Sequence, residues 1–138
     1  MTGGTKLIIV AVVVTGFYAW FGFSIPQSRW DAPQKKVLTL DMKPKQLAAE
    51  GKEIFRKAGC GVCHSVTGEK LRGPDLSRIG AERDAEMMAA ILYSGTSDMP
   101  AANRPPANLN NAEITAVIAY MQSLGGRPKV KIGDIKEP

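Results

Sequence analysis

The sequence has few side chains that could bind a metal ion or form a disulfide. Its 138 residues include two cysteines and one histidine, and all three lie within Cys60-Gly61-Val62-Cys63-His64. Structural zinc takes four Cys or His ligands, so this set is one ligand short. A disulfide would not require the histidine. A redox dithiol would sit in a strand–helix unit, and no strand-like run precedes Cys60. These scarcities argue against zinc, disulfide and dithiol chemistry.

Aromatic residues and charge of one sign are also scarce. Aromatic residues make up 7% of the chain, and a small domain with few of them fills a core with difficulty. Residues 45–125 hold nine basic and nine acidic residues, so the net charge of +5 comes from Lys6, residues 24–43 and residues 126–138. No basic face accompanies an aromatic platform, which argues against a nucleic-acid partner. The basic segments suit either a membrane and a protein partner or solvated tails.

The cysteines and the histidine form the pattern C-x-x-C-H, the attachment sequence of c-type haem. Cysteines three residues apart on a helical turn face the same side, so Cys60 and Cys63 can both form thioether bonds to the haem vinyl groups. His64 then lies under the macrocycle and can ligate the iron. We therefore expect one covalent haem c, which would also supply apolar bulk to the core.

One long hydrophobic run stands near the N-terminus. Residues 7–25 follow a short flank of residues 1–6 and lack any charge. Nineteen helical residues span about 28 Å, close to the hydrocarbon thickness of a bilayer. Aromatic residues gather toward the C-terminal end of the run, as in an interfacial belt. A cleaved signal peptide would have a shorter apolar core and an A-x-A-like site, which Gly22-Phe23-Ser24 matches poorly. The run predicts an uncleaved transmembrane anchor.

The orientation of the anchor rests on two signals that disagree. Arg29, Lys35 and Lys36 follow the run, and a count of basic residues alone would place this side in the cytoplasm. Covalent c-type haem is attached outside the cytoplasmic membrane, and this requirement overrides a weak charge count. We expect a single-pass protein of the bacterial cytoplasmic membrane with its haem domain in the periplasm.

Beyond the anchor, the pattern predicts a proline-punctuated linker at 26–43, a helical haem domain at 44–125 and a basic tail at 126–138. Helices are expected at 44–57, at 83–94 with Gly95 as C-cap, and after Asn110, which forms a capping box with Glu113. The tail alternates basic and apolar residues at 129–132, which suits an edge strand added to another subunit. A disordered terminus is the alternative.

The second iron ligand has to come from a residue other than histidine. Met87, Met88 and Met121 fall on predicted helices, where methionine is usually part of the core. Met99 instead lies in the non-helical stretch 96–109 and precedes Pro100. Thioether sulfur is a soft ligand that favours ferrous iron. Met99 is therefore the expected axial ligand, and a surface-loop methionine beside an open iron site is the alternative.

The arrangement resembles the class I (mono-haem) cytochromes c, in a membrane-anchored form, over about residues 44–124. The resemblance rests on these features in order: Gly51 and Phe55 before the haem motif, Gly73-Pro74-Asp75-Leu76 after it, Gly95, Met99-Pro100 and Tyr120 on the last helix. It implies an all-α fold around one covalent haem, preceded by a single transmembrane helix, in which the first and last helices of the haem domain cross.

The resemblance also implies roles for residues around the haem. The carbonyl of Pro74 would accept a hydrogen bond from His64, and Leu76 would pack on the haem. Many relatives place a Trp or Tyr near a haem propionate, but both Trp residues here lie in or just after the apolar run. The remaining candidates for contact with the propionates are Arg72, Arg78 and Arg83. The alternative is that these arginines are simply exposed.

His and Met ligation leaves no iron position for a substrate, so the expected activity is electron transfer and not catalysis. We expect a subunit of a respiratory or photosynthetic electron-transport complex. Its partners would be integral membrane or membrane-bound subunits, redox donor and acceptor proteins, and the lipid bilayer through residues 7–25. The alternative is a haem enzyme or gas-binding module with an open iron site, peroxidase-like or nitric oxide-binding. It would need a distal His, Arg or Gln, and the chain has no second histidine.

Overall fold

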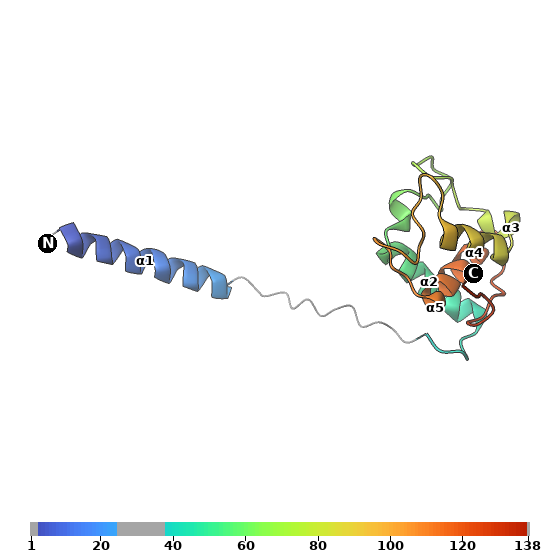
Figure 1. The fold of residues 1–138 in the computed structure, drawn as a ribbon, viewed down its shortest axis with the longest axis horizontal. Helices are drawn as coiled ribbons and strands as arrows, with labels where there is room; N and C mark the ends of the chain where they lie inside the picture. Colours follow the sequence, from blue (N-terminus) through green and yellow to red (C-terminus); the bar gives the residue numbers. More distant parts are fainter. Residues whose placement is uncertain (1–2, 25–37, 138) are drawn as a thin grey trace. The chain divides into compact units, whose positions relative to one another are not determined.

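The computed structural model describes residues 3–24 and 38–137, and it divides the chain into two compact units, residues 1–36 and 37–138. Most of the predicted linker, up to residue 37, lies outside the described residues. All regular structure in the described ranges is helical (Figure 1). The all-α expectation is therefore confirmed.

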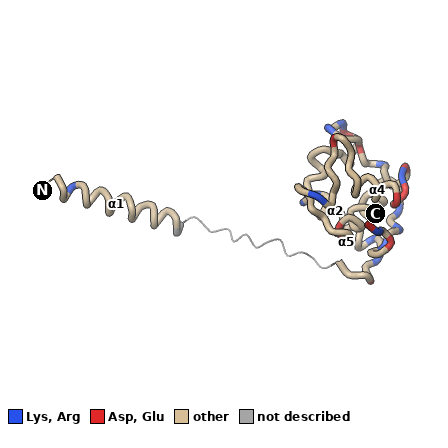
Figure 2. Tube along the Cα trace, in the orientation of Figure 1, with Lys and Arg blue, Asp and Glu red and all other residues tan. Residues whose placement is uncertain are grey.

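The first unit contains helix α1, Gly3–Ser24. By length and composition, residues 3–22 could cross a membrane, and none of their side chains is buried. Lys6 is the only charged residue of the helix, near its N-terminal end (Figure 2). Toward the other end, the ring of Phe17 lies 6.0 Å from that of Tyr18 and 6.0 Å from that of Phe21.

The second unit is built from α2 (Pro44–Lys57), the 3-10 turn η1 (Cys60–Val62), α3 (Ile79–Glu82), α4 (Ala85–Ser94) and α5 (Asn111–Ser123). Pro44 occupies the first position of α2, where its missing N–H costs nothing. The side chain of Asn110 accepts from the N–H of Glu113 at 2.9 Å, and Glu113 accepts from the N–H of Asn110 at 2.8 Å. The predicted capping box thus starts α5.

Helix α5 is the centre of the domain. Its residues 114–121 are all buried, and α2 packs against it (Figure 1). The crossing is closest at Gly51, where an added Cβ would lie 1.8 Å from the carbonyl oxygen of Ala116. The rings of Phe55 and Tyr120 then meet edge to face at 5.4 Å. The expected crossing of the first and last domain helices is confirmed.

The region around α4 differs from the prediction of a helix at 83–94. Asp84 accepts a hydrogen bond from the N–H of Met87 at 2.7 Å, so α4 starts at Ala85 and not at Arg83. The short helix α3 before it was not predicted. Gly95 follows α4 with φ 69° and donates to the carbonyl of Ile91 at 2.8 Å, as a C-cap glycine should.

The C-terminal tail was expected to add an edge strand to another subunit, and its docking on a partner stays a prediction. Its described residues, 126–137, contain no strand. The tail instead packs on its own domain, with Val130 and Ile135 buried in the core. Gln122 of α5 fixes its path, since Oε1 accepts from the N–H groups of Lys129 at 2.9 Å and Val130 at 3.1 Å. The apolar residues that suggested an edge strand are used inside the molecule.

Candidate functional site

The haem motif lies on a tight turn directly after α2. Gly59 takes the left-handed conformation, with φ 77°, and begins the turn η1. The N–H groups of Cys63 and His64 both donate to the carbonyl of Cys60, at 3.2 and 3.0 Å. This winding brings Cys60, Cys63 and His64 together without help from distant segments. Both cysteines are free and half-buried, and burial raises the pKa of the Cys60 thiol.

The imidazole of His64 is fixed by the loop that follows. Its Nδ1 lies 2.9 Å from the carbonyl oxygen of Pro74. A carbonyl can only accept, so Nδ1 carries the proton and Nε2 keeps its lone pair for a metal ion. The backbone of Gly73 covers the ring, because a Cβ there would lie 2.6 Å from His64 Cε1. The Gly73 N–H also donates to the carbonyl of Cys63 at 2.7 Å.

Ser65 and Asp75 shape the loop that presents Pro74. Ser65 is buried, and its hydroxyl accepts from the N–H groups of Thr67 and Glu69, both at 3.1 Å. Asp75 accepts from the hydroxyl of Ser77 and from the N–H of Gly68. These bonds, led by that from Ser77, hold the pKa of Asp75 below its ordinary value.

Leu76 ties the end of the same loop to its start. Its N–H donates to the carbonyl of Ser65 at 2.8 Å, and its side chain is buried in the core. The part played by Ser65 was missed from the sequence, although a small polar residue directly after the motif is a signal for such a turn.

Met99 lies on a second tight turn, after α4. The N–H of Thr96 donates to the carbonyl of Met99 at 2.8 Å, and the N–H of Met99 donates to the Thr96 hydroxyl at 3.2 Å. Gly95 allows the close return, because its Cβ would lie 2.7 Å from the Met99 carbonyl oxygen. Met99 is half-buried. Its role as iron ligand stays a prediction.

The other methionines in the domain have structural surroundings. Met88 and Met121 are buried, at 3% and 6% exposure, and Met42 packs against the same core. Met87 is exposed, and its sulfur lies 3.0 Å from the guanidinium of Arg83. Met99 is thus the one domain methionine held on a backbone turn outside the core.

All three arginines considered for the haem propionates are exposed, and they lie within residues 72–83. Arg72 precedes Gly73, Arg78 precedes α3 and approaches Gly125, and Arg83 follows α3. Propionate contacts from these residues stay a prediction.

The donor set fits a haem better than a bare metal ion. Within the described residues, no group of three or more His, Cys, Asp or Glu side chains could hold a metal. A haem brings its own ring nitrogens, so a c-type haem asks the protein only for axial ligands and for thiols that bond to its vinyl groups. Two thiols on one turn, followed by an imidazole with a free Nε2, meet that requirement. The residues present therefore fit the group.

A small all-α domain with this motif and a carbonyl-anchored histidine defines a c-type haem protein. The sequence model of the family described as "Cytochrome c" matches residues 48–125, more than half of the chain. The chain belongs to the cytochrome c family, which implies a covalently bound haem c and haem-based electron transfer. A comparison with curated proteins finds no match.

Proposed function

We propose that this protein carries electrons through a single haem c, with His64 and Met99 as axial ligands, as a membrane-anchored subunit of an electron-transport chain. The observation that carries the proposal is the pair of rigid turns. One holds His64 with Nδ1 on the Pro74 carbonyl at 2.9 Å, and the other holds Met99 between Gly95 and Pro100.

The haem, when bound, supplies one-electron redox chemistry. His64 and Met99 would hold its iron, which would leave no position for a substrate, so the protein would act as a carrier and not as an enzyme. The thioether of Met99 favours the ferrous state and raises the reduction potential. Pro74 holds the imidazole in one orientation, so that the ligands move little between the two redox states.

Helix α1 supports the membrane part of the proposal. It has the length and apolar composition of a single span and no charge after Lys6. Because c-type haem is attached outside the cytoplasmic membrane, the location that we propose for the domain is the bacterial periplasm. There it would exchange electrons with membrane-bound donor and acceptor proteins, such as those of a respiratory or photosynthetic chain.

Carbon monoxide binding to the reduced protein at neutral pH tests the ligation. We expect the wild type to bind carbon monoxide poorly and Met99→Leu to bind it readily while keeping the covalent haem. Met88→Leu is the matched control, because Met88 is buried in the core, and it should behave as the wild type. Ready binding by the wild type would overturn the proposal and favour a gas-binding or catalytic haem with an open iron site.

A further inference from the structure

The C-terminal tail reaches the loop that carries Met99. Val130 and Ile135 anchor the tail in the core, so its last described residues have a defined position. Glu137 then accepts a hydrogen bond from the side-chain amide of Asn103 at 3.2 Å. Asn103 lies four residues after Met99 in the same loop. The tail is therefore bonded to the segment that presents the proposed iron ligand.

The two ends of that loop are joined to each other and to the tail. The hydroxyl of Tyr93, in the last turn of α4, donates to the side-chain oxygen of Asn111, the first residue of α5. The amide of Asn111 donates in turn to the carbonyl of Ile135 at 3.1 Å. One asparagine thus connects the start of the loop, its end and the tail.

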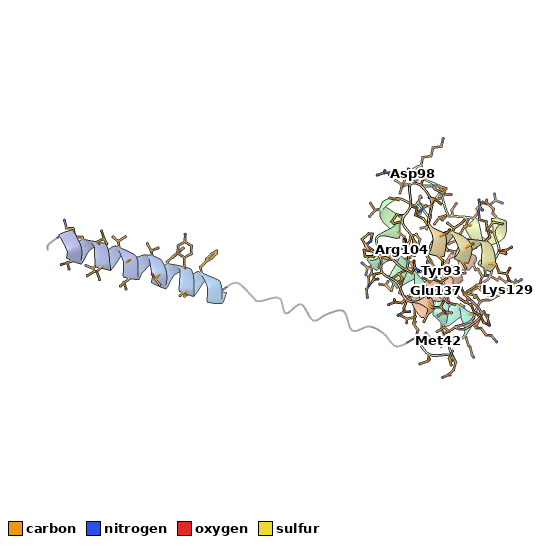
Figure 3. All side chains as sticks on the ribbon, viewed as in Figure 1. Met42, Tyr93, Asp98, Arg104, Lys129 and Glu137 are labelled. Carbon is orange, nitrogen blue, oxygen red and sulfur yellow. The ribbon has the colours of Figure 1, made fainter. Side chains whose placement is uncertain are left out.

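The cluster is partly buried. The hydrogen bonds of Asn111 to Tyr93 and Ile135 are partly shielded from water, whereas the bond between Asn103 and Glu137 is exposed. Tyr93 is buried, and its pKa is raised first by burial and then by the charge of Glu137; Figure 3 labels the two residues in neighbouring positions of the view. The side-chain oxygen of Asn103 is also buried and has no hydrogen-bond partner. A loss of the tail would remove the acceptors of two side-chain amides of this cluster, those of Asn103 and Asn111.

Between the cluster and Met99, the loop is braced by its backbone. The N–H of Ala102 donates to the carbonyl of Leu92 at 2.7 Å, and the N–H of Leu109 donates to the carbonyl of Ala102 at 2.8 Å. Ala101 and Ala102 are buried. The loop that carries the Met99 turn is therefore supported by its own backbone bonds and by the hydrogen bonds of Tyr93, Asn111 and the tail.

We propose that residues 129–137 form a clamp that holds the Met99 loop closed, and that Tyr93 and Asn111 are positioning residues for the iron ligand. This inference rests on the proposed ligation by Met99. Local opening of a loop costs less than global unfolding, and its free energy sets how often a ligand leaves the metal. The clamp raises that opening free energy, so it slows exchange of Met99 for outside ligands.

The test is the rate at which imidazole replaces Met99 in the ferric holoprotein under native conditions. Tyr93→Phe removes one hydrogen bond and should raise the rate about fivefold, the factor that corresponds to the net contribution of one such bond. Asn111→Ala breaks both links and should raise it about tenfold or more. Glu137→Ala should also raise the rate, and Glu137→Gln, which keeps an acceptor oxygen, should restore it.

Ser94→Ala is the matched control. Ser94 neighbours Tyr93, and its hydroxyl donates to the carbonyl of Ala90 at 2.6 Å without touching the tail. Its exchange rate should stay at the wild-type value. If Asn111→Ala does not fold, Tyr93→Phe and the Glu137 pair still decide the question.

The two proposals fail in different ways. If the ferric wild type and Met99→Leu have the same absorption spectrum, Met99 is not a ligand and the ligation proposal is wrong. The clamp proposal is wrong if Met99 is a ligand but is exchanged at the wild-type rate in Tyr93→Phe, in Glu137→Ala and in any folded Asn111→Ala. In that case the proposed function still stands.

Discussion

At the scale of single residues, the orientation of His64 depends on a position that has no side chain. The backbone at Gly73 lies against the imidazole, and the next residue, Pro74, supplies the carbonyl that Nδ1 contacts. Pro74 cannot turn freely because its φ is fixed by the ring. Gly73 therefore lets the backbone approach the imidazole closely because it has no side chain, and Pro74 holds the acceptor carbonyl rigidly because its φ is fixed.

Gly73→Ala should displace the His64 ring. The new Cβ would lie 2.6 Å from Cε1 and 2.8 Å from Nδ1. Carbon atoms prefer at least about 3.5 Å, so the ring must move by about 1 Å and lose its bond to Pro74. We expect the unfolding free energy to fall by about 2 kcal/mol, which denaturant unfolding measures. We also expect the reduction potential to vary more with pH than in the wild type, which pH-dependent voltammetry measures.

Gly61→Ala is the control for this prediction, because it also adds one methyl group next to the haem ligands. Its Cβ would meet nothing closer than Phe55 Cε1, at 3.9 Å. It should leave unfolding and voltammetry as in the wild type. Equal effects from both variants would show that the contact between Gly73 and the imidazole is unimportant.

Asp75 should make the loop below His64 sensitive to acid. The hydroxyl of Ser77 and the N–H of Gly68 lower the pKa of Asp75 from the ordinary value of 3.8. A carboxyl whose pKa is lowered in the folded state stabilises the protein at pH values above its ordinary pKa of 3.8. This stabilisation is lost as the pH falls through the folded-state pKa. Asp75→Asn should therefore lose less stability than the wild type between about pH 6 and about pH 3.

Chemical unfolding at the two pH values measures this difference. Asp41→Asn serves as control, since Asp41 is an exposed carboxylate in the turn before α2. It should keep the full acid dependence of the wild type. An Asp75→Asn variant with the wild-type dependence would argue against the role of Asp75.

The sequence was informative about the site where the chemistry is local. Cys60, Cys63 and His64 follow from one motif, because adjacent residues on a turn need no tertiary contact to meet. Met99 stood out because it is outside the helical pattern. The packing of Gly73 on the imidazole and the Asn111 cluster could not be predicted, since each depends on residues nine or more positions apart.

At the scale of elements, the crossing of α2 and α5 organises the domain. A helix pair approaches this closely only where one side chain is missing, and Gly51 provides that position against the carbonyl of Ala116. Phe55 and Tyr120, one turn further along their helices, then come into ring contact at 5.4 Å. The crossing thus positions the end of α2, from which the haem motif continues.

Gly51→Ala should be strongly destabilising although alanine is the better helix former. The gain in helix propensity is about 1 kcal/mol. The new Cβ would lie 1.8 Å from a backbone oxygen, and the two helices would have to separate, at a cost of about 3 kcal/mol or more. The steric cost is larger, so the unfolding free energy should fall by about 2 kcal/mol.

Lys52→Ala, at the adjacent exposed position of α2, is the control for Gly51→Ala. It should change the unfolding free energy by less than about 0.5 kcal/mol. Denaturant unfolding of the holoprotein compares the two. A stabilised Gly51→Ala variant would mean that the helices do not cross where the structure has them.

Elements with strong local signals were predicted well. Helix α2 has the predicted bounds, and α5 begins at its capping box. Helix α3 was missed because four residues are too few to show a helical period. The alternation at 129–132 does not specify whether an apolar face packs on a partner or on the chain's own core. In the structure, Val130 is buried in the chain's own core and Ile132 packs against it.

At the scale of the whole molecule, the two units have separate requirements. Among the described residues, every member of the core lies within residues 38–137, and the described side chains of α1 are all exposed. Water is a poor environment for such a helix, since leucine, isoleucine, valine and aromatic side chains would each stay hydrated. A bilayer would remove this cost, and under the proposed anchoring the helix would also limit how far the domain can diffuse.

Replacing residues 1–25 by a cleavable signal peptide should therefore release a soluble domain with its haem attached. Its midpoint potential and unfolding free energy should equal those of the full chain, because no core residue is lost. Electron delivery to membrane-bound acceptors should fall at equal total protein, since tethering gives an effective concentration of about millimolar that free solution does not. Adding excess soluble domain should restore the rate.

The matched measurement on the full chain is its retention and mass. We expect the wild type to stay with membranes through alkaline carbonate washing and to keep α1 in its intact mass. A mature protein that begins after residue 24 would identify the apolar helix as a signal sequence. A released domain that lost its haem or needed detergent would show that α1 belongs to the fold of the domain, and either result would overturn the separation of anchor and carrier.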